Sequence, residues 1–512
     1  MYRLLFLALV LLMACNKQAS DIDSILITVE RNYEVPKKSE QVVIFIDWKE
    51  LIKRAPGVQH TTPVVTDRNF GTEVPVGLID TDDDKSPDFL ILEYTLNSNE
   101  PVFTFLIEAG NSKQEVITST QEVDTRFEVS FLTPLREYEK KNGAVTDFSS
   151  ALVNSTMNQY PDLEKFPIYA PDRWNYEYSF FMAGVYRQGK KVKSDSYVLY
   201  AQQWVDGFIT NEGSFEPGVY NMKEYKLDDI LPGRVVIYLH EETKNPKYKA
   251  IADTLILHLA QQPKTSDGGY WHKEIYPYQM WLDGIFMADV FSMQYAKAYN
   301  QPEWFDESIH QIKLIYQRTL DPTTGLLYHG WDESKNPVWA HPERGTSPEF
   351  WGRAVGWYLM ALVESLDYIP ENHPERDEVI KILQDLSAVV RKYQDSSSKL
   401  WYQVMDKGNQ PGNWIETSCS AMFAYAFAKG HRQGFLDESY LVTANEAFNA
   451  LLDQYVFVDD AGNLHLDQTV KIGTLNPKNS KGDFEYYIST ERRIDDYKGL
   501  ASLLFLSIEL NK

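Results

Sequence analysis

PEFWGRAVGWYLMALVESLDY, residues 348–368, is the stretch that decides the class of fold. Within it, Val355, Leu359, Leu362 and Leu366 recur at steps of four, three and four residues. This spacing places the four side chains along one face of an α-helix. The same periodicity returns in two other stretches, at Leu282, Phe286, Val290 and Met293, and at Val379, Ile382, Leu386 and Val390. The sequence therefore predicts a mainly α-helical protein.

About twelve segments of this kind follow one another between residues 167 and 512. They lie near 174–188, 194–209, 227–241, 246–262, 279–298, 302–319, 348–368, 375–394, 416–430, 438–456, 484–490 and 495–510. Paired with their neighbours, they predict six α-hairpins that close into an (α/α)6 barrel over 167–512. A linear helical solenoid has a similar helix count, but it typically shows a regular repeat consensus, which is absent here.

The chain before residue 160 has a different pattern. Short apolar or alternating runs are separated by Pro, Asn and Asp, at 24–29, 41–46, 89–94, 102–107 and 126–131. Several such runs at close spacing are typical of strands in a β-sandwich. We therefore expect a smaller β-rich domain at 25–160, before the barrel.

The first fifteen residues form a targeting signal. Arg3 precedes an unbroken apolar run from residue 4 to residue 13, too short to span a bilayer, which is typical of a secretory signal peptide. The ending Leu12-Met13-Ala14-Cys15 resembles a bacterial lipobox and predicts lipidation of Cys15, with 16–24 as a tether. These features predict a lipid-anchored protein of the bacterial cell envelope, periplasmic or at the outer membrane. The alternative is a plain signal peptide with an incidental cysteine.

Composition narrows the possible partners. The net charge of −23 gives nucleic acid no attractive field, so a nucleic-acid partner is not expected. The 12 Trp and 32 Tyr slightly favour a carbohydrate ligand, because aromatic rings stack on sugar faces, although helical cores also hold many aromatics. An acidic sugar would need locally placed Arg, Lys or helix N-termini.

Polar and aromatic residues gather at the starts of alternate predicted helices. The clusters lie at 174–176, 225–228, 279–284, 349–353 and 413–416. Because the starts of alternate helices share one end of an α/α barrel, a single funnel is expected to be lined by all of them.

Asp283 is the leading candidate for chemistry in this funnel. It sits beside Trp281 and near other aromatic residues, which would exclude water from its carboxyl group and favour the protonated form. The helix dipole would lower the pKa of Asp283, whereas repulsion from a second carboxylate such as Asp228 would raise it. The alternative is an aspartate that only caps the helix.

Four further residues are candidates for contacts with a ligand. His329 follows a turn and precedes Trp331 and two acids, although a lone histidine is more often structural. Trp351, Arg353 and Trp357 do not share one helical stripe, so Arg353 is not expected to be simply a core residue. Arginine suits a planar carboxylate, and the alternative for it is a surface salt bridge.

The first domain contains a possible metal loop. Asp80, Asp82, Asp84 and Asp88 alternate between two predicted strands, a spacing that could wrap calcium. However, Lys85 stands where such loops usually carry Gly, and a solvated acidic turn is slightly favoured. No other motif for a metal or cofactor is apparent, so no cofactor is expected.

From residue 167 onward the chain resembles the unsaturated uronyl hydrolases of glycoside hydrolase families 88 and 105, particularly the rhamnogalacturonyl branch. The resemblance is carried in one order by WNY at 174–176, YKLD at 225–228, GYWHK at 269–273, MWLDG at 280–284, YHGWDE at 328–333, SPEFWGRAVGW at 347–357, WYQ at 401–403 and FEYY at 484–487. Any one of these motifs alone would be weak, but together they are specific.

The resemblance implies an enzyme that removes a terminal 4,5-unsaturated uronic acid, galacturonyl or glucuronyl, from acidic oligosaccharides produced by lyases. It implies that Asp283 is the general acid/base and Asp228 its carboxylate partner. It also implies substrate contacts for Tyr176, His272, Trp281, His329, Trp351, Arg353 and Trp357. Two alternatives are a non-catalytic glycan-binding lipoprotein and another α/α-barrel enzyme, such as a polysaccharide lyase or an ordinary glycosidase.

Overall fold

A computed structural model describes residues 24–32, 39–96, 102–120, 122–163, 174, 176–476, 478 and 480–512. The chain divides into two compact units, unit 1 with Met1–Asp67 and Gly71–Phe131, and unit 2 with Arg68–Phe70 and Leu132–Lys512. The predicted signal peptide, the lipidation site at Cys15 and the tether up to residue 23 lie outside the described residues.

Unit 1 is built on two β-sheets that share one apolar core. One sheet has the order β9, β1, β7, β3, β4, and the other has the order β2, β6, β5, β8. Ile27 and Phe105 of the first sheet and Ile44 and Leu92 of the second lie in the same buried cluster. The strands are β1 Ser24–Arg31, β2 Glu40–Asp47, β3 Val64–Asp67, β4 Thr72–Val74, β5 Val76–Asp80, β6 Phe89–Leu96, β7 Val102–Glu108, β8 Val116–Thr118 and β9 Phe127–Pro134, with the short helices α1 Trp48–Arg54 and η1 Pro56–His60. The predicted β-rich first domain is confirmed.

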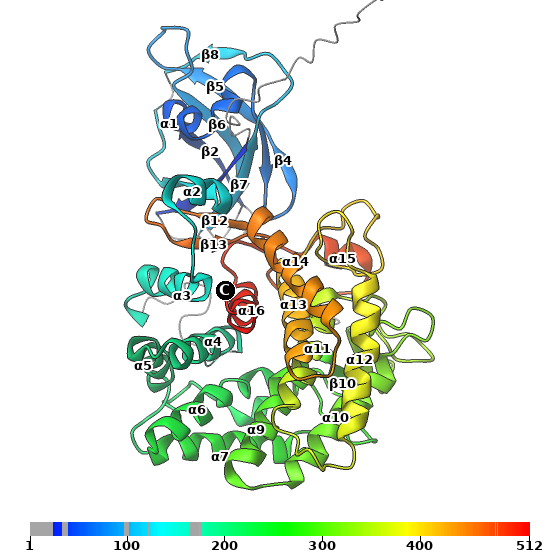
Figure 1. The fold of residues 1–512 in the computed structure, drawn as a ribbon. Helices are drawn as coiled ribbons and strands as arrows, with labels where there is room; N and C mark the ends of the chain where they lie inside the picture. The colour runs from blue at the N-terminus through cyan, green and yellow to red at the C-terminus, as the bar shows by residue number, and fades with distance from the viewer. Residues whose placement is uncertain are drawn as a thin grey trace, which may run out of the picture. The chain divides into compact units, whose positions relative to one another are not determined.

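Unit 2 is a closed ring of paired helices (Figure 1). The inner ring runs α4 Tyr176–Val192, α6 Gly233–Thr243, α9 Val290–Tyr299, α11 Gly352–Ser365, α13 Thr417–Arg432 and α16 Tyr497–Glu509. Each inner helix contacts the next, and α16 contacts α4, so the ring closes. The outer partners are α5 Asp195–Asp206, α7 Pro246–Gln261, α10 Glu303–Thr319, α12 Arg376–Lys392, α14 Glu438–Gln454 and α3 Phe148–Gln159. This arrangement confirms the predicted (α/α)6 barrel.

The helix that completes the ring is not the predicted one. The segment 484–490 was predicted as one of the twelve helices, but α15 is only Phe484–Ile488, and α3 packs against α16 instead. Phe148, Leu152 and Val153 of α3 are buried in the barrel core. Because α3 is rich in Ser, Asn and Thr, few of its apolar residues recur at helical spacing, and its helix propensity is low. Residues 132–160 consequently belong to unit 2, and the units divide near residue 131 rather than 160.

Short helices and strands lie outside the paired helices of the barrel. They are α2 Leu135–Asn142, η3 Met222–Glu224, η4 Leu227–Asp229, β10 Gln279–Trp281, α8 Leu282–Gly284, the π-helix η5 Ile285–Asp289, β11 Gly330–Asp332, β12 Val456–Val458, β13 Leu464–Leu466, β14 Thr469–Val470 and β15 Arg492–Arg493. The predicted helix at 279–298 therefore begins as a strand, because β10 pairs with β11 before the chain turns helical.

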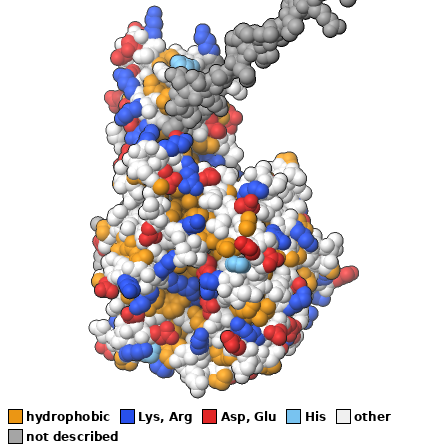
Figure 2. Space-filling view, viewed as in Figure 1, with side chains coloured by type: hydrophobic (Ala, Val, Ile, Leu, Met, Phe, Trp, Pro, Cys, Tyr) orange, Lys and Arg blue, Asp and Glu red, His pale blue; other side chains and the backbone are white. Residues whose placement is uncertain are grey.

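Acidic and basic side chains are interspersed on the face that Figure 2 shows, so the net negative charge is not gathered there into one patch. Within the described part of the chain, no helix combines the length and the apolar composition needed to cross a membrane.

Candidate active site

The two predicted carboxyl groups lie just before inner helices of the barrel. Asp228 is in η4, ahead of α6, and Asp283 is in α8, ahead of α9. Backbone hydrogen bonds tie both segments to the loops around them: Leu227 N donates to His272 O at 3.1 Å, and Leu282 N donates to His329 O at 3.0 Å. Sequence positions far apart are thereby held at one end of the barrel.

Asp228 is an ionised carboxylate with a cationic partner. Its Oδ2 lies 2.5 Å from Lys273 Nζ, and its Oδ1 lies 3.5 Å from His272 Nε2. Burial raises the pKa of Asp228, but the charge and hydrogen bond of Lys273 lead the effects that outweigh it and hold this pKa below the usual range. Burial lowers the pKa of His272 to about 4, so its ring is neutral near pH 7. Lys273 therefore supplies the positive charge beside Asp228.

The carboxyl group of Asp283 is available to react with a ligand. Its Oδ2 lies 3.3 Å from His329 Nε2, and neither atom makes a hydrogen bond of good geometry within the described structure. The side chain is 13% exposed, so a ligand in the funnel can reach it. It caps no helix, because the residue at the cap position is Trp281 and its side chain makes no capping bond. The capping alternative is thus not what the structure contains.

Tyr176 and His272 show that the two acids face the same space. Burial is the largest cause of the high pKa of Tyr176, and the charges of both Asp228 and Asp283 add to it. The same two charges act on the pKa of His272, against the larger effect of burial. The contacts agree: His272, beside Asp228, stacks on Trp281, and Trp281 in turn contacts His329, beside Asp283, so one continuous cluster of side chains joins the two acids.

A wall of aromatic rings borders these groups. Trp281 stacks on His272, with ring centroids 4.3 Å apart, and meets His329 edge-on at 5.4 Å. Trp351 lies 4.7 Å from His329 and stacks on Tyr487 at 5.7 Å. Sugar faces stack well on such surfaces, since a ring offers apolar area at a low entropic cost.

Trp357 lies deeper, among core aromatics. Its ring is 5.0 Å from Phe180, 4.9 Å from Phe286 and 6.2 Å from Tyr176. The exposed fraction of Trp357 is 1%, so it supports the floor of the site beneath Tyr176.

Three residues of the site lay within recognised motifs but were not predicted to be functional. Lys273 pairs with Asp228, Tyr487 OH lies 2.7 Å from His329 Nδ1, and Gln403 Oε1 accepts from Trp351 Nε1 at 3.1 Å. Lys273 directly follows His272, a signal that could have identified it. Tyr487 and Gln403 act on the site through residues more than 50 positions away, so local spacing could not reveal them.

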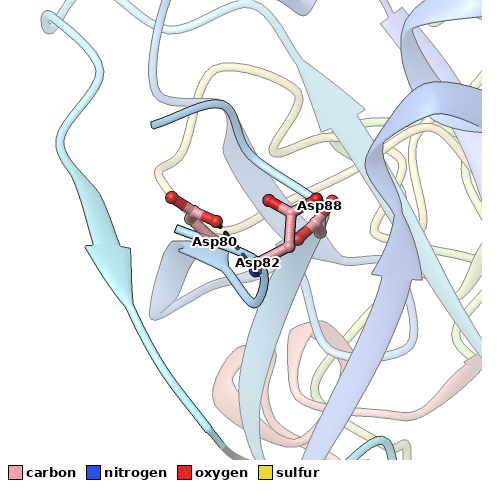
Figure 3. Close-up of side chains that lie close together, drawn as sticks. All are labelled: Asp80, Asp82 and Asp88. Carbon is pink, nitrogen blue, oxygen red and sulfur yellow. Dashed lines mark hydrogen bonds between the residues drawn. The ribbon is translucent and has the colours of Figure 1, made fainter. Parts of the chain in front are cut away.

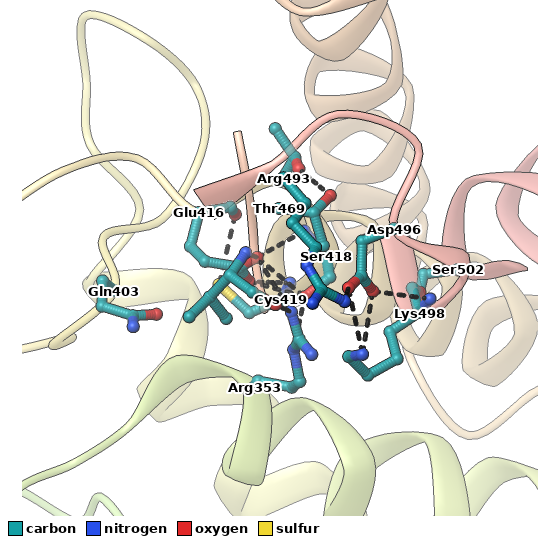
Figure 4. Close-up of polar contacts among 12 residues, drawn as sticks. Arg353, Gln403, Glu416, Ser418, Cys419, Thr469, Arg493, Asp496, Lys498 and Ser502 are labelled. Carbon is teal, nitrogen blue, oxygen red and sulfur yellow. Dashed lines mark hydrogen bonds and ion pairs between the residues drawn. The ribbon is translucent and has the colours of Figure 1, made fainter. Parts of the chain in front are cut away.

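Arg353 is buried, contrary to prediction. Only 1% of it is exposed; its Nε donates to Ser418 Oγ at 2.9 Å, its Nη2 donates to Val470 O, and Nη2 lies 3.5 Å from Glu416 Oε1 (Figure 4). The offset from Trp351 and Trp357 suggested a side chain outside the core. However, every residue of α11 is buried, so this helix has no solvent face. The surface salt-bridge alternative fails for the same reason, and a direct contact with substrate stays a prediction.

The acidic loop of unit 1 brings together three of its four predicted ligands (Figure 3). Carboxylate oxygens of Asp80, Asp82 and Asp88 lie within 4.8 Å of one another, while Asp84 Oδ1 accepts from Ser86 N instead. Asp80 also accepts backbone N–H bonds from Asp83 and Lys85, at 2.7 and 2.8 Å. These internal bonds are what a solvated acidic turn needs, and calcium binding stays a prediction.

A closed (α/α)6 ring with two acids and an aromatic wall at its mouth is typical of a carbohydrate-active hydrolase. Residues 148–512 match the family model described as Glycosyl Hydrolase Family 88. The protein belongs to glycosyl hydrolase family 88. Residues 29–165 match a second model, described as a domain of unknown function (DUF4861).

The names of individual proteins that resemble this chain are consistent with the family. The unsaturated rhamnogalacturonyl hydrolase YesR of Bacillus subtilis is 26% identical over 343 residues, which are 65% of this chain and 89% of YesR. A solved family 105 glycoside hydrolase of C. acetobutylicum is 36% identical with a TM-score of 0.68, covering 71% of this chain and 99% of that one. The unsaturated glucuronyl hydrolase of Bacillus sp. GL1, 13% identical with a TM-score of 0.53 over 72% of this chain and 97% of that one, shows the same fold.

Proposed function

We propose that this enzyme removes a terminal 4,5-unsaturated uronic acid from oligosaccharides by adding water across the C4=C5 double bond. The membership of glycosyl hydrolase family 88 and the similarity to a named unsaturated rhamnogalacturonyl hydrolase support this reaction. The observation that carries it is the pair of carboxyl groups, Asp283 and Asp228, which lie beside His329 and His272, the two histidines in contact with Trp281.

The proposed reaction begins with proton transfer. Asp283 donates its proton to C4, and positive charge develops at C5 and the ring oxygen. Water then adds its oxygen to C5 and returns a proton to Asp283, so the acid is regenerated. The product is a hemiketal at C5, which opens to a ketone and releases the neighbouring sugar. No covalent bond forms between the protein and the sugar.

The other residues have supporting roles in this proposal. The Asp228 carboxylate stabilises the positive charge that develops near C5, and Lys273 holds Asp228 in place. Trp281 and Trp351, which are 6% and 2% exposed, form the aromatic wall that positions His272 and His329 beside the uronyl ring. His329, fixed by Tyr487, orients the carboxyl group of Asp283.

The decisive assay uses disaccharides generated by polysaccharide lyases, because their double bond absorbs ultraviolet light. The wild-type enzyme is expected to abolish this absorbance and to release one free sugar per event. An increase in absorbance with intact polysaccharide would identify a lyase and contradict the proposal. Binding without turnover of any disaccharide in a panel of unsaturated galacturonyl and glucuronyl substrates would identify a glycan-binding protein instead.

We also propose that the enzyme is anchored in the bacterial cell envelope by a lipid on Cys15. The run from residue 4 to residue 13 and the Leu12-Met13-Ala14-Cys15 ending support this location. In cells making the wild-type chain, the protein is expected in the membrane fraction, and Cys15→Ser is expected to remove it from that fraction. Cys419→Ser is the matched control, since this thiol is buried. Equal membrane association of wild type and Cys15→Ser would contradict the anchor.

A further inference from the structure

The helix that carries Asp283 into the site contains a π-helical turn. This turn, η5, spans Ile285–Asp289 between α8 and α9. A π-turn inserts one extra residue into a helix and is frequently found at functional sites. One residue corresponds to about 100° of rotation, so the turn sets the direction of Asp283 relative to α9. Whatever stabilises η5 therefore also orients Asp283.

The last residue of η5 is a buried acid that the proposed mechanism does not use. Asp289 is 1% exposed, and both of its carboxyl oxygens are enclosed without a hydrogen bond of good geometry to described residues. Ser292 Oγ donates to the backbone O of Asp289 at 3.0 Å and also contacts Ser308 Oγ. Ser308 Oγ also neighbours the carboxyl group of Asp289 and favours its charged form, so Ser308 of α10 is the polar neighbour of this side chain.

The surroundings of Asp289 disfavour its charged form. The groups that face it are Glu307 and Ser308 of α10, Lys264 and Tyr270 of the preceding loop, and Tyr358 of α11. Lys264 Nζ pairs with Glu307 at 2.8 Å and lies over the ring of Tyr270, and its charge lowers the pKa of Asp289 less than burial and Glu307 raise it. Burial, followed by the charge of Glu307, raises the pKa of Asp289 well above its usual range. A buried carboxylate without a partner would be strongly unfavourable.

We propose that protonated Asp289 is a positioning residue: its neutral side chain keeps η5 in the π-helical form that aims Asp283 into the site, and loss of its proton loosens this turn. Asp289 does not touch the substrate. An asparagine would fill the same space and would be neutral at every pH. The inference rests on the proposed role of Asp283.

A stability measurement tests the protonation without substrate. For an acid whose folded-state pKa is raised above the unfolded value of about 3.9, the stabilising effect is complete below that value and is lost as pH rises to the folded pKa. The isosteric variant Asp289→Asn has no such dependence. The difference in Tm between Asp289→Asn and wild type is therefore expected to grow in favour of the variant as pH rises from about 4 to the folded-state pKa of Asp289. Asp385→Asn, an exposed acid on α12, is the control and should give a constant difference.

An activity measurement tests the positioning. At acidic pH, Asp289→Asn is expected to keep kcat within about twofold of wild type. As pH rises through the folded pKa of Asp289, wild type alone should lose kcat, so the ratio of variant to wild type should rise. Asp289→Leu, which is neutral but has no polar group, should lower kcat by about tenfold or more, with a much smaller change in KM.

Two outcomes would overturn the proposal. A Tm difference that does not change with pH would mean that Asp289 does not bind a proton on folding. A kcat ratio that stays flat while the Tm difference grows would mean that the proton does not control the site. If Asp289→Leu fails to fold, Asp289→Asn still decides both points. Failure of the proposed function appears separately, as full activity of Asp283→Asn with an unchanged Tm profile for Asp289→Asn.

Discussion

Asp283→Asn is expected to lower kcat on unsaturated disaccharides by about 10²–10⁴-fold, because an amide cannot donate a proton to C4. The substitution keeps the size of the side chain, and its neighbour His329 remains fixed by Tyr487. The exposed fraction of Asp283 is small and it caps no helix, so the melting temperature should change little. The measurement is the initial rate of loss of ultraviolet absorbance, compared with wild type at several pH values.

Asp385→Asn serves again as the matched control. This acid pairs with Lys381 on the exposed face of α12, far from the carboxyl pair in sequence, and its loss should leave kcat unchanged. Retention of more than about a tenth of the wild-type kcat by Asp283→Asn would contradict the assignment of the general acid. In that case Asp228 would become the first candidate, since it is the other acid at the mouth.

Glu364→Gln is expected to lower the free energy of unfolding of the barrel by about 3–5 kcal/mol, because it leaves the buried Arg234 without its carboxylate and removes one that Arg187 and Lys429 share. Glu364 on α11 is fully buried and lies 2.5 Å from Arg187 of α4, from Arg234 of α6 and from Lys429 of α13. Burial raises the pKa of Glu364, but these three cations outweigh it and hold the pKa well below the usual range.

This cluster joins the whole inner ring. Arg234 Nε lies 3.4 Å from Gln294 Oε1 of α9, and the Arg187 guanidinium lies 4.8 Å from the ring of Phe505 on α16. All six inner helices thus meet around one carboxylate, so its loss should weaken closure of the ring.

Calorimetric unfolding of wild type, Glu364→Gln and Glu378→Gln measures this effect. Glu378 pairs with Lys313 while about half exposed, and its loss should cost less than about 1 kcal/mol. A loss of similar size in the two variants would contradict a central role for Glu364. The result is independent of the proposed reaction, because it needs no substrate.

Local sequence patterns determined the helices, the β-rich first domain and most of the candidate site. The periodicity at 355–366 is a property of a single helix, and α11 follows it closely. The motifs around Asp228 and Asp283 likewise sit at the starts of inner helices, where the sequence analysis expected them. These features depend on residues within a few positions of each other, so a single sequence is enough to predict them.

Tertiary structure alone decided which helix closes the ring, that Arg353 is buried, and that Asp283 precedes a π-turn ending in a buried acid. Each of these depends on contacts between segments far apart in the chain. The helix α3 meets α16 across more than 300 residues, and Arg353 is surrounded by Ser418 and Val470. Burial and electrostatic environment are set by the neighbours that folding brings together, and periodicity within one segment does not reveal those neighbours.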